Sequence, residues 1–259
     1  MKNQTVLITG ASEGIGHEFC RIFAEKGYDL VIIARNENKL NEMKSHLSEN
    51  KNIKVHVIVK DLSKPDAAKE IYSIVKAENI NIDILINNAG FGIYNNFWET
   101  DYEKEQQMYY VNIMALAGLT NLFAKEMMNN GGGKILNVAS TAAFQPGPTM
   151  AGYYASKAFV LNYSKAINFE MKDKGVQVST LCPGPTSTEF QKRAKMEDLN
   201  LFKKGLTMTG KEVAQIGYNG LMKGKAVIIA GAMNKLSAMM AKHSPDAIIL
   251  RVVKKLQSK

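Results

Sequence analysis

The stretch Thr9-Gly10-Ala11-Ser12-Glu13-Gly14-Ile15-Gly16 decides the fold of this chain of 259 residues. It follows a short apolar run at residues 5–8 and precedes a segment with helical character that ends near Gly27. The three glycines allow a tight turn and let backbone amides approach an anionic group at the start of a helix. In this context the stretch predicts a strand, a turn and a helix that together bind the pyrophosphate of a dinucleotide.

Apolar, β-branched runs recur along the chain, with segments of helical length between them. We expect seven strands, at residues 6–8, 30–33, 55–59, 84–86, 135–138, 176–181 and 227–229. The runs are almost continuously apolar rather than alternating, which is typical of parallel strands that are covered on both faces. The sequence therefore predicts an α/β fold with a single Rossmann-type, doubly wound parallel sheet of about seven strands, flanked by helices on both faces.

The segments between the strands have the pattern of crossover helices. Beyond the first helix, we expect helices at residues 38–49, 65–78, 101–129, 151–174 and 211–222. The chain has no internal repeat and no linker rich in proline and glycine, so we interpret residues 1–259 as one domain.

Two segments stand apart from this alternation. Residues 189–209 are charged, carry scattered apolar side chains and follow the Pro183-Gly184-Pro185 break, so we interpret them as a substrate lid. Residues 232–259 are predicted to form an amphipathic, helical C-terminal extension. This extension would pack on the body or on a second subunit, or dock on a membrane surface.

Composition limits the classes of partner. The net charge is +9, but the lysines are mostly dispersed, which favours solvated helix faces over a nucleic-acid site. No apolar run approaches the roughly 18 residues of a membrane span, and the first residues lack a signal-peptide pattern. The two cysteines show no framework spacing, so we expect a cytoplasmic protein. The four histidines lack paired ligand spacing, and we expect no metal site.

Tyr153 and Lys157 stand four residues apart in a predicted helix, thirteen residues beyond Ser140. Residues at i and i+4 share one face of a helix, about 5–6 Å apart at Cβ. A fixed positive charge there would lower the pKa of the phenol, which is near 10 in a free tyrosine. The three residues therefore indicate a hydride-transfer site in which Tyr153 exchanges the proton.

The choice of cofactor depends on the residues that follow the second strand. An acidic side chain there accepts the 2′-hydroxyl of NAD, and a basic one pairs with the 2′-phosphate of NADP. This chain has Arg35 and Asn36, with Lys39 one helical turn later. The Arg35 guanidinium matches a phosphate, whereas Glu13 in the glycine stretch would weaken phosphate binding. We expect NADP(H), with NAD(H) as the less favoured alternative.

The chain resembles the short-chain dehydrogenase/reductase family over about residues 4–231, and specifically its NADP-preferring ketone and hydroxysteroid reductases. The resemblance rests on seven ordered motifs: residues 9–16, Asp61-Leu62, Asn87-Asn88-Ala89-Gly90, Asn112, Ser140, Tyr153-Tyr154-Ala155-Ser156-Lys157, and residues 183–188, Pro-Gly-Pro-Thr-Ser-Thr. The family usually has a β-branched aliphatic residue where this chain has Thr186. The family's contact there is largely through the backbone, so we expect binding to persist.

The resemblance implies roles for individual residues. Tyr153 would be the general acid and base, and Ser140 would hold the substrate oxygen. Lys157 would hold the nicotinamide ribose, and Asn112 would hold a relay water through a local distortion of its helix. The implied catalytic residues are thus Asn112, Ser140, Tyr153 and Lys157.

The resemblance also implies a set of cofactor contacts running from the glycine stretch to the end of the sixth strand. The expected cofactor-binding residues are Gly10, Ser12, Glu13, Gly14, Ile15, Gly16, Arg35, Asn36, Lys39, Asp61, Leu62, Asn88, Ala89, Gly90, Tyr153, Lys157, Pro183, Gly184, Thr186 and Thr188. Many relatives pair long helices between subunits, which implies a homodimer or homotetramer.

The residues near the expected site are mainly apolar, which favours a small hydrophobic carbonyl or alcohol substrate. They include Phe91, Ile93, Tyr94, Phe97, Trp98, Met150, Phe190 and residues 144–148. Steroids, aryl ketones, long-chain acyl compounds and diketones all remain open. The leading interpretation is an NADP(H)-dependent oxidoreductase of ketones and secondary alcohols. The alternatives are a dinucleotide-binding regulator with little turnover and a basic protein that binds nucleic acid or membrane.

Overall fold

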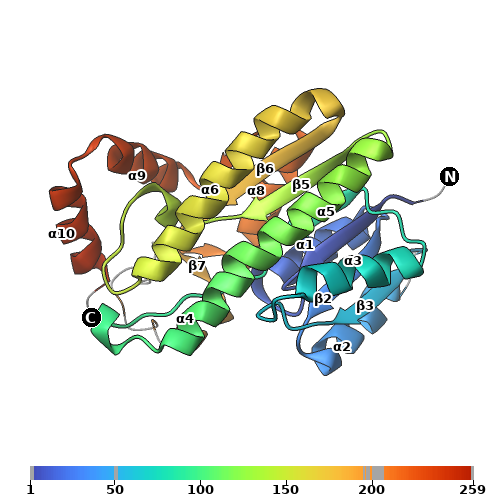
Figure 1. Cartoon of the computed structure of the whole chain (residues 1–259), viewed down its shortest axis with the longest axis horizontal. Coiled ribbons are helices and arrows are strands. Elements are labelled where there is room, and N and C mark those ends of the chain that lie inside the picture. The colour runs from blue at the N-terminus through green and yellow to red at the C-terminus, as the bar shows by residue number, and fades with distance from the viewer. Residues whose placement is uncertain (1–2, 50–51, 195, 197–198, 200–206, 258–259) are drawn as a thin grey trace.

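The computed structural model describes residues 3–49, 52–194, 196, 199 and 207–257. A seven-stranded parallel sheet runs through its centre, in the order β3-β2-β1-β4-β5-β6-β9 (Figure 1). Its strands are β1 (Thr5–Thr9), β2 (Asp29–Ala34), β3 (Val55–Val59), β4 (Ile84–Asn87), β5 (Gly133–Val138), β6 (Val176–Cys182) and β9 (Val227–Ile229). Each predicted strand is present, so the prediction of one doubly wound sheet is confirmed.

The order of the strands reverses between β1 and β4. The chain passes outward from β1 through β2 to β3, and then returns to place β4 on the other side of β1. In open α/β sheets, ligands bind at such a reversal, beyond the carboxyl ends of the strands. The fold therefore places the candidate site where β1 and β4 both end.

Two helical layers cover the sheet. One face packs against α1 (Gly14–Glu25), α2 (Glu37–Ser48) and α8 (Gly210–Met222). The opposite face packs against α3 (Ala67–Ala77), α5 (Leu116–Asn129) and α6 (Ala151–Met171), which cross in front of the sheet in Figure 1. Because both faces are covered, most positions of the strands are apolar and buried, as the sequence indicated, although β6 also buries Ser179 and Thr180.

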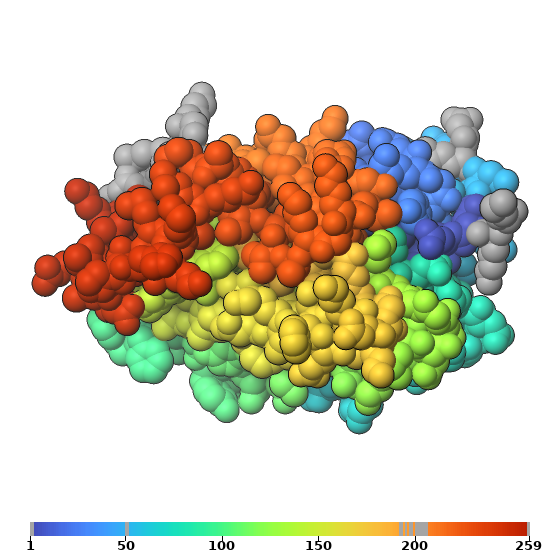
Figure 2. Space-filling view, turned by 90° about the horizontal axis from the view of Figure 1, so that it is seen from above, coloured from blue at the N-terminus to red at the C-terminus, as the bar shows by residue number. Residues whose placement is uncertain are grey.

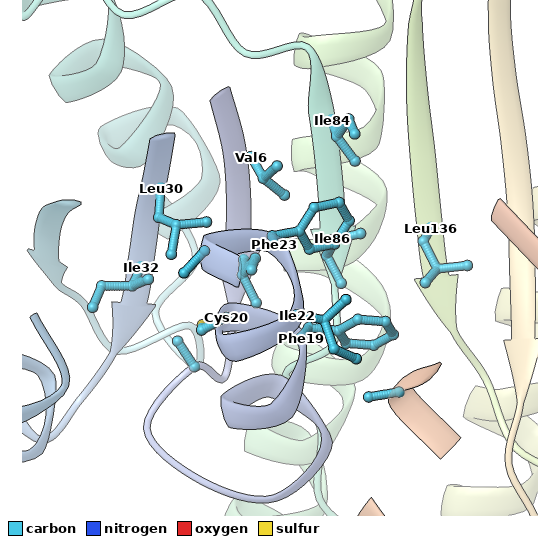
Figure 3. Packing of buried hydrophobic residues seen from close by; sticks show 14 of the residues in the cluster. Val6, Phe19, Cys20, Ile22, Phe23, Leu30, Ile32, Ile84, Ile86 and Leu136 are labelled. Atoms are coloured by element: carbon cyan, nitrogen blue, oxygen red, sulfur yellow. The ribbon is translucent and has the colours of Figure 1, made fainter. Parts of the chain in front are cut away.

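The apolar face of α1 anchors the glycine stretch to the sheet. Phe19 and Phe23 are fully buried against Val6, Ile86 and Leu136 (Figure 3). Burial of each phenylalanine side chain contributes about 2 kcal/mol. The helix ends where predicted, because Gly27 adopts a left-handed φ of +79° just beyond its C-cap. The start of α1 is therefore held at a fixed distance from the strand ends.

The long helix predicted at residues 101–129 is present but not uniform. It consists of α4 (Tyr102–Tyr109), a π-helical segment (Tyr110–Ala115) and α5. π-Helical turns are rare and occur often at functional sites. The distortion implied for Asn112 therefore lies where the sequence analysis placed it.

The chain beyond β6 departs from the regular alternation. The short strands β7 (Thr186–Ser187) and β8 (Met208–Thr209) pair in parallel, and the short helix α7 (Glu189–Arg193) begins between them. The region interpreted as a lid, residues 189–209, lies in part outside the described residues. Since β7 pairs with β8, the two ends of the segment between these strands lie side by side.

The C-terminal extension is helical, as predicted. It forms α9 (Ala232–His243) and α10 (Asp246–Leu256), which lie together at one end of the molecule (Figure 1). Helices elsewhere in the described ranges pack along the sheet. Within those ranges, no helix has the length and apolar character required to cross a lipid bilayer.

Candidate active site

The glycine stretch forms the turn between β1 and α1. Gly10 and Gly14 have left-handed φ angles of +65° and +58°. A Cβ at Gly10 would lie 2.9 Å from the Cα of Ala89, and one at Gly16 would collide with the carbonyl oxygen of Gly10. Larger residues are therefore excluded by close backbone approach at this turn.

The start of α1 is open to an anionic group. The N-cap residue Glu13 does not cap the helix with its side chain, and the first turn contains no acidic residue. The partial positive charge of a helix N-terminus favours an anion at this place. The side chains of Ser12 and Ile15 are partly exposed beside it. This turn therefore fits the pyrophosphate of a dinucleotide.

Asn88 joins the end of β4 to the glycine turn. Its side-chain amide donates hydrogen bonds to the backbone oxygens of Thr9 (3.0 Å) and Gly10 (3.2 Å). In return, the hydroxyl of Thr9 accepts from the backbone N–H groups of Asn88 and Ala89, each at 3.0 Å. Thr9 belongs to the glycine motif, but the sequence analysis gave its side chain no role. It fixes the two loops to each other.

Charged side chains gather beyond the end of β2. Arg35 is exposed, and its charge together with hydrogen bonds from Ser63 holds the pKa of Asp61 below its ordinary value, although burial acts in the opposite direction. Lys39 Nζ lies 3.4 Å from Glu13 Oε2, so the two charges compensate each other. Arg35 is therefore an exposed cation at this edge of the sheet, close to the carboxylate of Asp61.

The other residues expected at the adenosine end have structural partners. Asn36 caps α2, because its side-chain oxygen accepts from the N–H of Lys39 at 3.0 Å. Leu62 is buried in the apolar cluster beside α3. The adenine contact expected from Leu62 thus stays a prediction, and its side chain already has a role in packing.

Asn112 lies fully buried in the π-helical segment. Its amide donates to the backbone oxygen of Phe91 (3.0 Å) and to the Ser156 hydroxyl (3.1 Å), and its oxygen accepts from the N–H of Phe91 at 3.1 Å. These bonds fix the loop after β4 against α6. A Cβ at Gly90 would lie 3.1 Å from Asn112 Oδ1 and 3.2 Å from Lys157 Nζ, so Gly90 leaves room at this junction.

Ser140 and Tyr153 come together at the carboxyl edge of the sheet, with the Ser140 hydroxyl close enough to influence the pKa of the Tyr153 phenol. Ser140 lies two residues beyond the end of β5, and its Oγ accepts a hydrogen bond from the N–H of Ala142 at 3.1 Å. Burial raises the pKa of Tyr153 to about 12, and the nearby Ser140 hydroxyl only partly opposes this shift. The prediction of a lowered tyrosine pKa is wrong for this arrangement, because desolvation of the phenol dominates.

Lys157 lies on the same face of α6 as Tyr153, as the spacing predicted. Its ammonium lies 5.7 Å from the centroid of the Tyr153 ring and donates to the backbone oxygen of Val138 at 3.0 Å. Burial lowers the pKa of Lys157 to about 8, and the neighbouring Cys182 opposes this shift. The lysine is therefore a buried cation held between β5 and β6, directed partly away from the phenol.

The segment after β6, residues 183–188, packs beside Ser140 and the glycine turn. The backbone oxygen of Pro183 accepts from the N–H of Thr141 at 2.8 Å, and Gly184 packs closely against Asn234 of α9. Thr186 is buried, and its hydroxyl donates to the oxygen of Gly184 at 2.9 Å. The methyl group of Thr188 would lie 3.4 Å from a Cβ at Gly14. The start of the segment that we interpret as a lid therefore packs against the glycine turn.

Only some of the apolar residues expected near the substrate lie beside Tyr153. Tyr94, Met150 and Phe190 pack around it in one cluster, together with Ile249 of α10. Ile93 and Phe97 line a small pocket together with Tyr153, although Phe97 is 75% exposed, whereas Trp98 is 80% exposed. Phe144 and residues 145–148 line a groove with Tyr154 and Leu250 instead.

Two further features beside the site escaped the sequence analysis. A Cβ at Gly92 would lie 2.9 Å from the end of the Met150 side chain, 3.0 Å from Phe190 and 3.2 Å from Tyr153, so any side chain there would press on these three. Thr149 has a left-handed φ of +60°, which is unusual for a β-branched residue. Its position in Pro-Thr-Met gave no sign of this. Gly92, however, follows the recognised Asn-Asn-Ala-Gly motif by only two residues, and this proximity was a usable signal.

Comparison with known proteins agrees with this geometry. Residues 4–198 match the family model described as short chain dehydrogenase. Over 193 residues the chain is 33% identical to the 17-beta-hydroxysteroid dehydrogenase type 3 of Mus musculus, and over 195 residues it is 31% identical to the very-long-chain 3-oxoacyl-CoA reductase of Anas platyrhynchos. Each match covers 73% of this chain and 62% of the relative, so the chain matches less than two thirds of these proteins.

A solved structure is similar over almost the whole chain. The short-chain dehydrogenase from Sphingobium yanoikuyae in complex with NADPH is 31% identical, with a TM-score of 0.83 and coverage of 91% of each chain. The family model, the identities and the fold therefore agree. They show that this chain belongs to the short-chain dehydrogenase/reductase family of oxidoreductases.

Proposed function

We propose that this protein is an NADP(H)-dependent oxidoreductase that interconverts a hydrophobic ketone and its secondary alcohol. The observation that carries the proposal is that the buried ammonium of Lys157 lies 5.7 Å from the ring of Tyr153, on the helix face that also has the hydroxyl of Ser140 nearby. A binding protein without turnover has no need for this arrangement. The arrangement suits proton transfer to a carbonyl oxygen that both hydroxyls face.

The roles of the side chains follow from their contacts. Tyr153 gives its proton to the carbonyl oxygen during reduction and takes it back during oxidation. Ser140 donates a hydrogen bond to the same oxygen and orients it. Lys157 supplies positive charge at the nicotinamide ribose, and Asn112 keeps the loop at Phe91 and α6 in register. The nicotinamide cofactor supplies or accepts the hydride when it is bound.

The preference for NADP(H) rests on Arg35. Its side chain is exposed beyond β2, and the nearby carboxylate of Asp61 is held by Ser63. Glu13, which would repel a phosphate, is paired with Lys39. The glycine turn and the start of α1 fit the pyrophosphate, because glycines at positions 10 and 16 leave the backbone uncovered and let its amides approach the anion. The NADPH complex of the Sphingobium yanoikuyae relative supports the same choice.

The substrate class follows from the apolar wall around Tyr153. Tyr94, Met150 and Phe190 form this wall with side chains from α10. The relatives named for hydroxysteroid and 3-oxoacyl-CoA substrates support a bulky, apolar carbonyl compound. We assign residues 189–209 as the lid over this wall, since β7 and β8 hold both ends of the segment beside the glycine turn.

We also expect a homodimer or homotetramer. Met114 and Phe169 are 59% and 85% exposed on the layer formed by α5, α6 and the π-helical segment. A second copy placed there would cover them, and sedimentation velocity of the purified protein measures the resulting mass.

The test combines binding with turnover. NADPH and NADH are titrated by fluorescence, and steroid, aryl and aliphatic ketones are then assayed by absorbance of the nicotinamide. We expect tighter binding of NADPH and turnover of the bulkier ketones. Binding without turnover across the panel would favour a dinucleotide-binding regulator, and failure to bind either cofactor would overturn the proposal.

A further inference from the structure

The last two helices, α9 and α10, form a unit that we call the C-terminal hairpin. Its inner side is held by the body: Ala238, Ile249 and Val253 are buried. Gln257, which follows α10, is also buried, and its amide donates to the hydroxyl of Tyr154 at 2.9 Å. The hairpin therefore has a fixed attachment, and its apolar residues on other sides are not needed to hold it.

The outer side of the hairpin is apolar as well. On α9, Met233, Leu236 and Met240 follow the spacing of one helix face, and Met240 is 59% exposed. On α10, Ile248 and Val252 stand one helical turn apart and are both more than half exposed. Large apolar side chains gathered on an exposed surface mark a binding surface.

On α10, Arg251 and Lys255 each stand three residues after one of the exposed apolar residues, Ile248 and Val252, and so lie beside them on the helix surface. Between residues 232 and 257 the chain has five lysines and arginines, namely Lys235, Lys242, Arg251, Lys254 and Lys255. The same segment has a single acidic residue, Asp246. Apolar side chains bordered by lysine and arginine are typical of helices that lie in the interface of a membrane.

The charge also argues against a second copy on this face. A symmetric dimer through α10 would bring Arg251, Lys254 and Lys255 of one copy close to the same residues of its partner. Like charges brought together in this way cost free energy. An anionic surface is attracted to the same face, by about 1 kcal/mol for each lysine or arginine near it.

We propose that the outer face of the C-terminal hairpin docks on the surface of a bilayer that contains anionic phospholipid. Figure 2 shows the hairpin at one end of the molecule, away from α1 and α2. The inner side of α10 packs in the same cluster as Tyr153 and Phe190. Docking therefore places the entrance of the candidate site near the lipid, where apolar compounds are concentrated.

The experiment measures sedimentation of the full-length protein with vesicles. Vesicles of phosphatidylcholine alone are compared with vesicles in which a third of it is replaced by phosphatidylglycerol. We expect sedimentation with the anionic vesicles only, and weaker sedimentation as salt screens the attraction. The double variant Lys254→Glu/Lys255→Glu is expected to lose at least about tenfold in affinity for the anionic vesicles. Met240→Gln/Ile248→Gln, which removes exposed apolar groups from the outer face of both helices, is also expected to lose binding.

Matched variants separate docking from general charge effects. Lys44→Glu/Lys69→Glu makes the same change of charge on exposed positions of α2 and α3, and it is expected to bind the vesicles like the unchanged protein. Equal loss in this control, or no preference for anionic vesicles, would overturn the proposal. So would hairpin variants that change the oligomeric mass and leave vesicle binding intact. Circular dichroism and NADPH binding verify that each variant is folded.

Discussion

The side-chain amide of Gln257 donates a hydrogen bond of 2.9 Å to the hydroxyl of Tyr154, which lies 103 residues earlier in the chain. The same residue accepts from Tyr94 at its backbone oxygen (2.7 Å) and from Thr149 at its side-chain oxygen (3.2 Å). Gln257 thus ties α10 to three separate parts of the wall around the candidate site. It also holds Thr149, whose left-handed backbone stores strain of about 1–3 kcal/mol.

Gln257→Leu is expected to destabilise the protein by about 1–3 kcal/mol, because it leaves buried polar partners without hydrogen bonds. We also expect KM for bulky ketones to rise more than kcat falls, since α10 shapes the wall and does not transfer the proton. Urea unfolding and steady-state kinetics measure the two effects. Gln215→Leu, on the exposed side of α8, is the control and should change neither. A Gln257 variant that behaved like this control would contradict the role.

Tyr153→Phe is expected to lower turnover by about 10²–10⁴-fold, because it removes the group that exchanges the proton. The dissociation constant of NADPH should stay nearly unchanged. The adjacent Tyr154→Phe is the matched control: its hydroxyl bonds to Gln257 and lies outside the catalytic group. It should keep most of its turnover and lose about 1 kcal/mol of stability. Equal loss of turnover in both variants would argue against Tyr153 as the specific acid and base.

Arg35→Ala is expected to weaken NADPH binding by about 10–100-fold, since a hydrogen bond to a charged group contributes about 1.5–3 kcal/mol. NADH binding should change little, because NADH lacks the 2′-phosphate. Lys39→Ala should have a smaller effect, since Glu13 already holds that ammonium. Fluorescence titration of both cofactors measures these differences. An equal loss for NADPH and NADH in Arg35→Ala would remove the basis for the NADP(H) preference.

Lys157 gives a prediction for stability against pH. Its pKa is lowered to about 8 in the folded protein, compared with about 10.5 when unfolded. Between these values the unfolded chain binds more protons, so the contribution of Lys157 to stability is lowest below pH 8 and rises up to about pH 10.5. The rise is a few kcal/mol, at about 1.4 kcal/mol per pKa unit.

Lys157→Met removes the titrating group and isolates this contribution. We expect the variant to be inactive, yet as stable as the unchanged protein or more stable at pH 7. Its advantage should shrink as the pH approaches 10.5. The difference between the two free energies of unfolding, measured in urea at several pH values, is the quantity to follow. A difference independent of pH would show that Lys157 keeps an ordinary pKa.

Gly92→Ala is expected to lower kcat by about tenfold or more, because the added Cβ would press on the ring of Tyr153 and misplace its hydroxyl. Cofactor affinity should be unaffected, since Gly92 contacts residues on the substrate side. Replacing Met150 with alanine in the same protein removes the nearest obstacle and should restore part of the turnover. A loss of NADPH binding in Gly92→Ala would place the residue in the cofactor site instead.

The sheet could be predicted from the sequence because most of its strands are nearly continuous apolar runs. The helices after the strands followed from the same alternation, and Gly27 marked the end of α1 correctly. The break between α9 and α10 at Ser244-Pro245 was missed, although a proline there is a usable signal. The local sequence pattern is therefore sufficient to predict the central strands and the helices between them.

The candidate site was predictable in part. Tyr153 and Lys157 follow from helical spacing alone, whereas Asn112 was identified only through the family resemblance. Gln257 could not be found, because its partners lie more than a hundred residues away in the sequence. The pKa of Tyr153 was predicted in the wrong direction, since spacing shows a nearby charge but not the burial that outweighs it. Long-range contact and desolvation are properties of the folded chain.

The pairing of β7 with β8 has a consequence for redesign. Thr186 lies opposite Met208, and Ser187 lies opposite Thr209, so the chain between them enters and leaves the body through one short stem. None of the seven central strands passes through that segment. We predict that a segment of other length and sequence, grafted between Thr188 and Met208, would change which compounds reach Tyr153 and would leave Thr188 in its place beside the glycine turn.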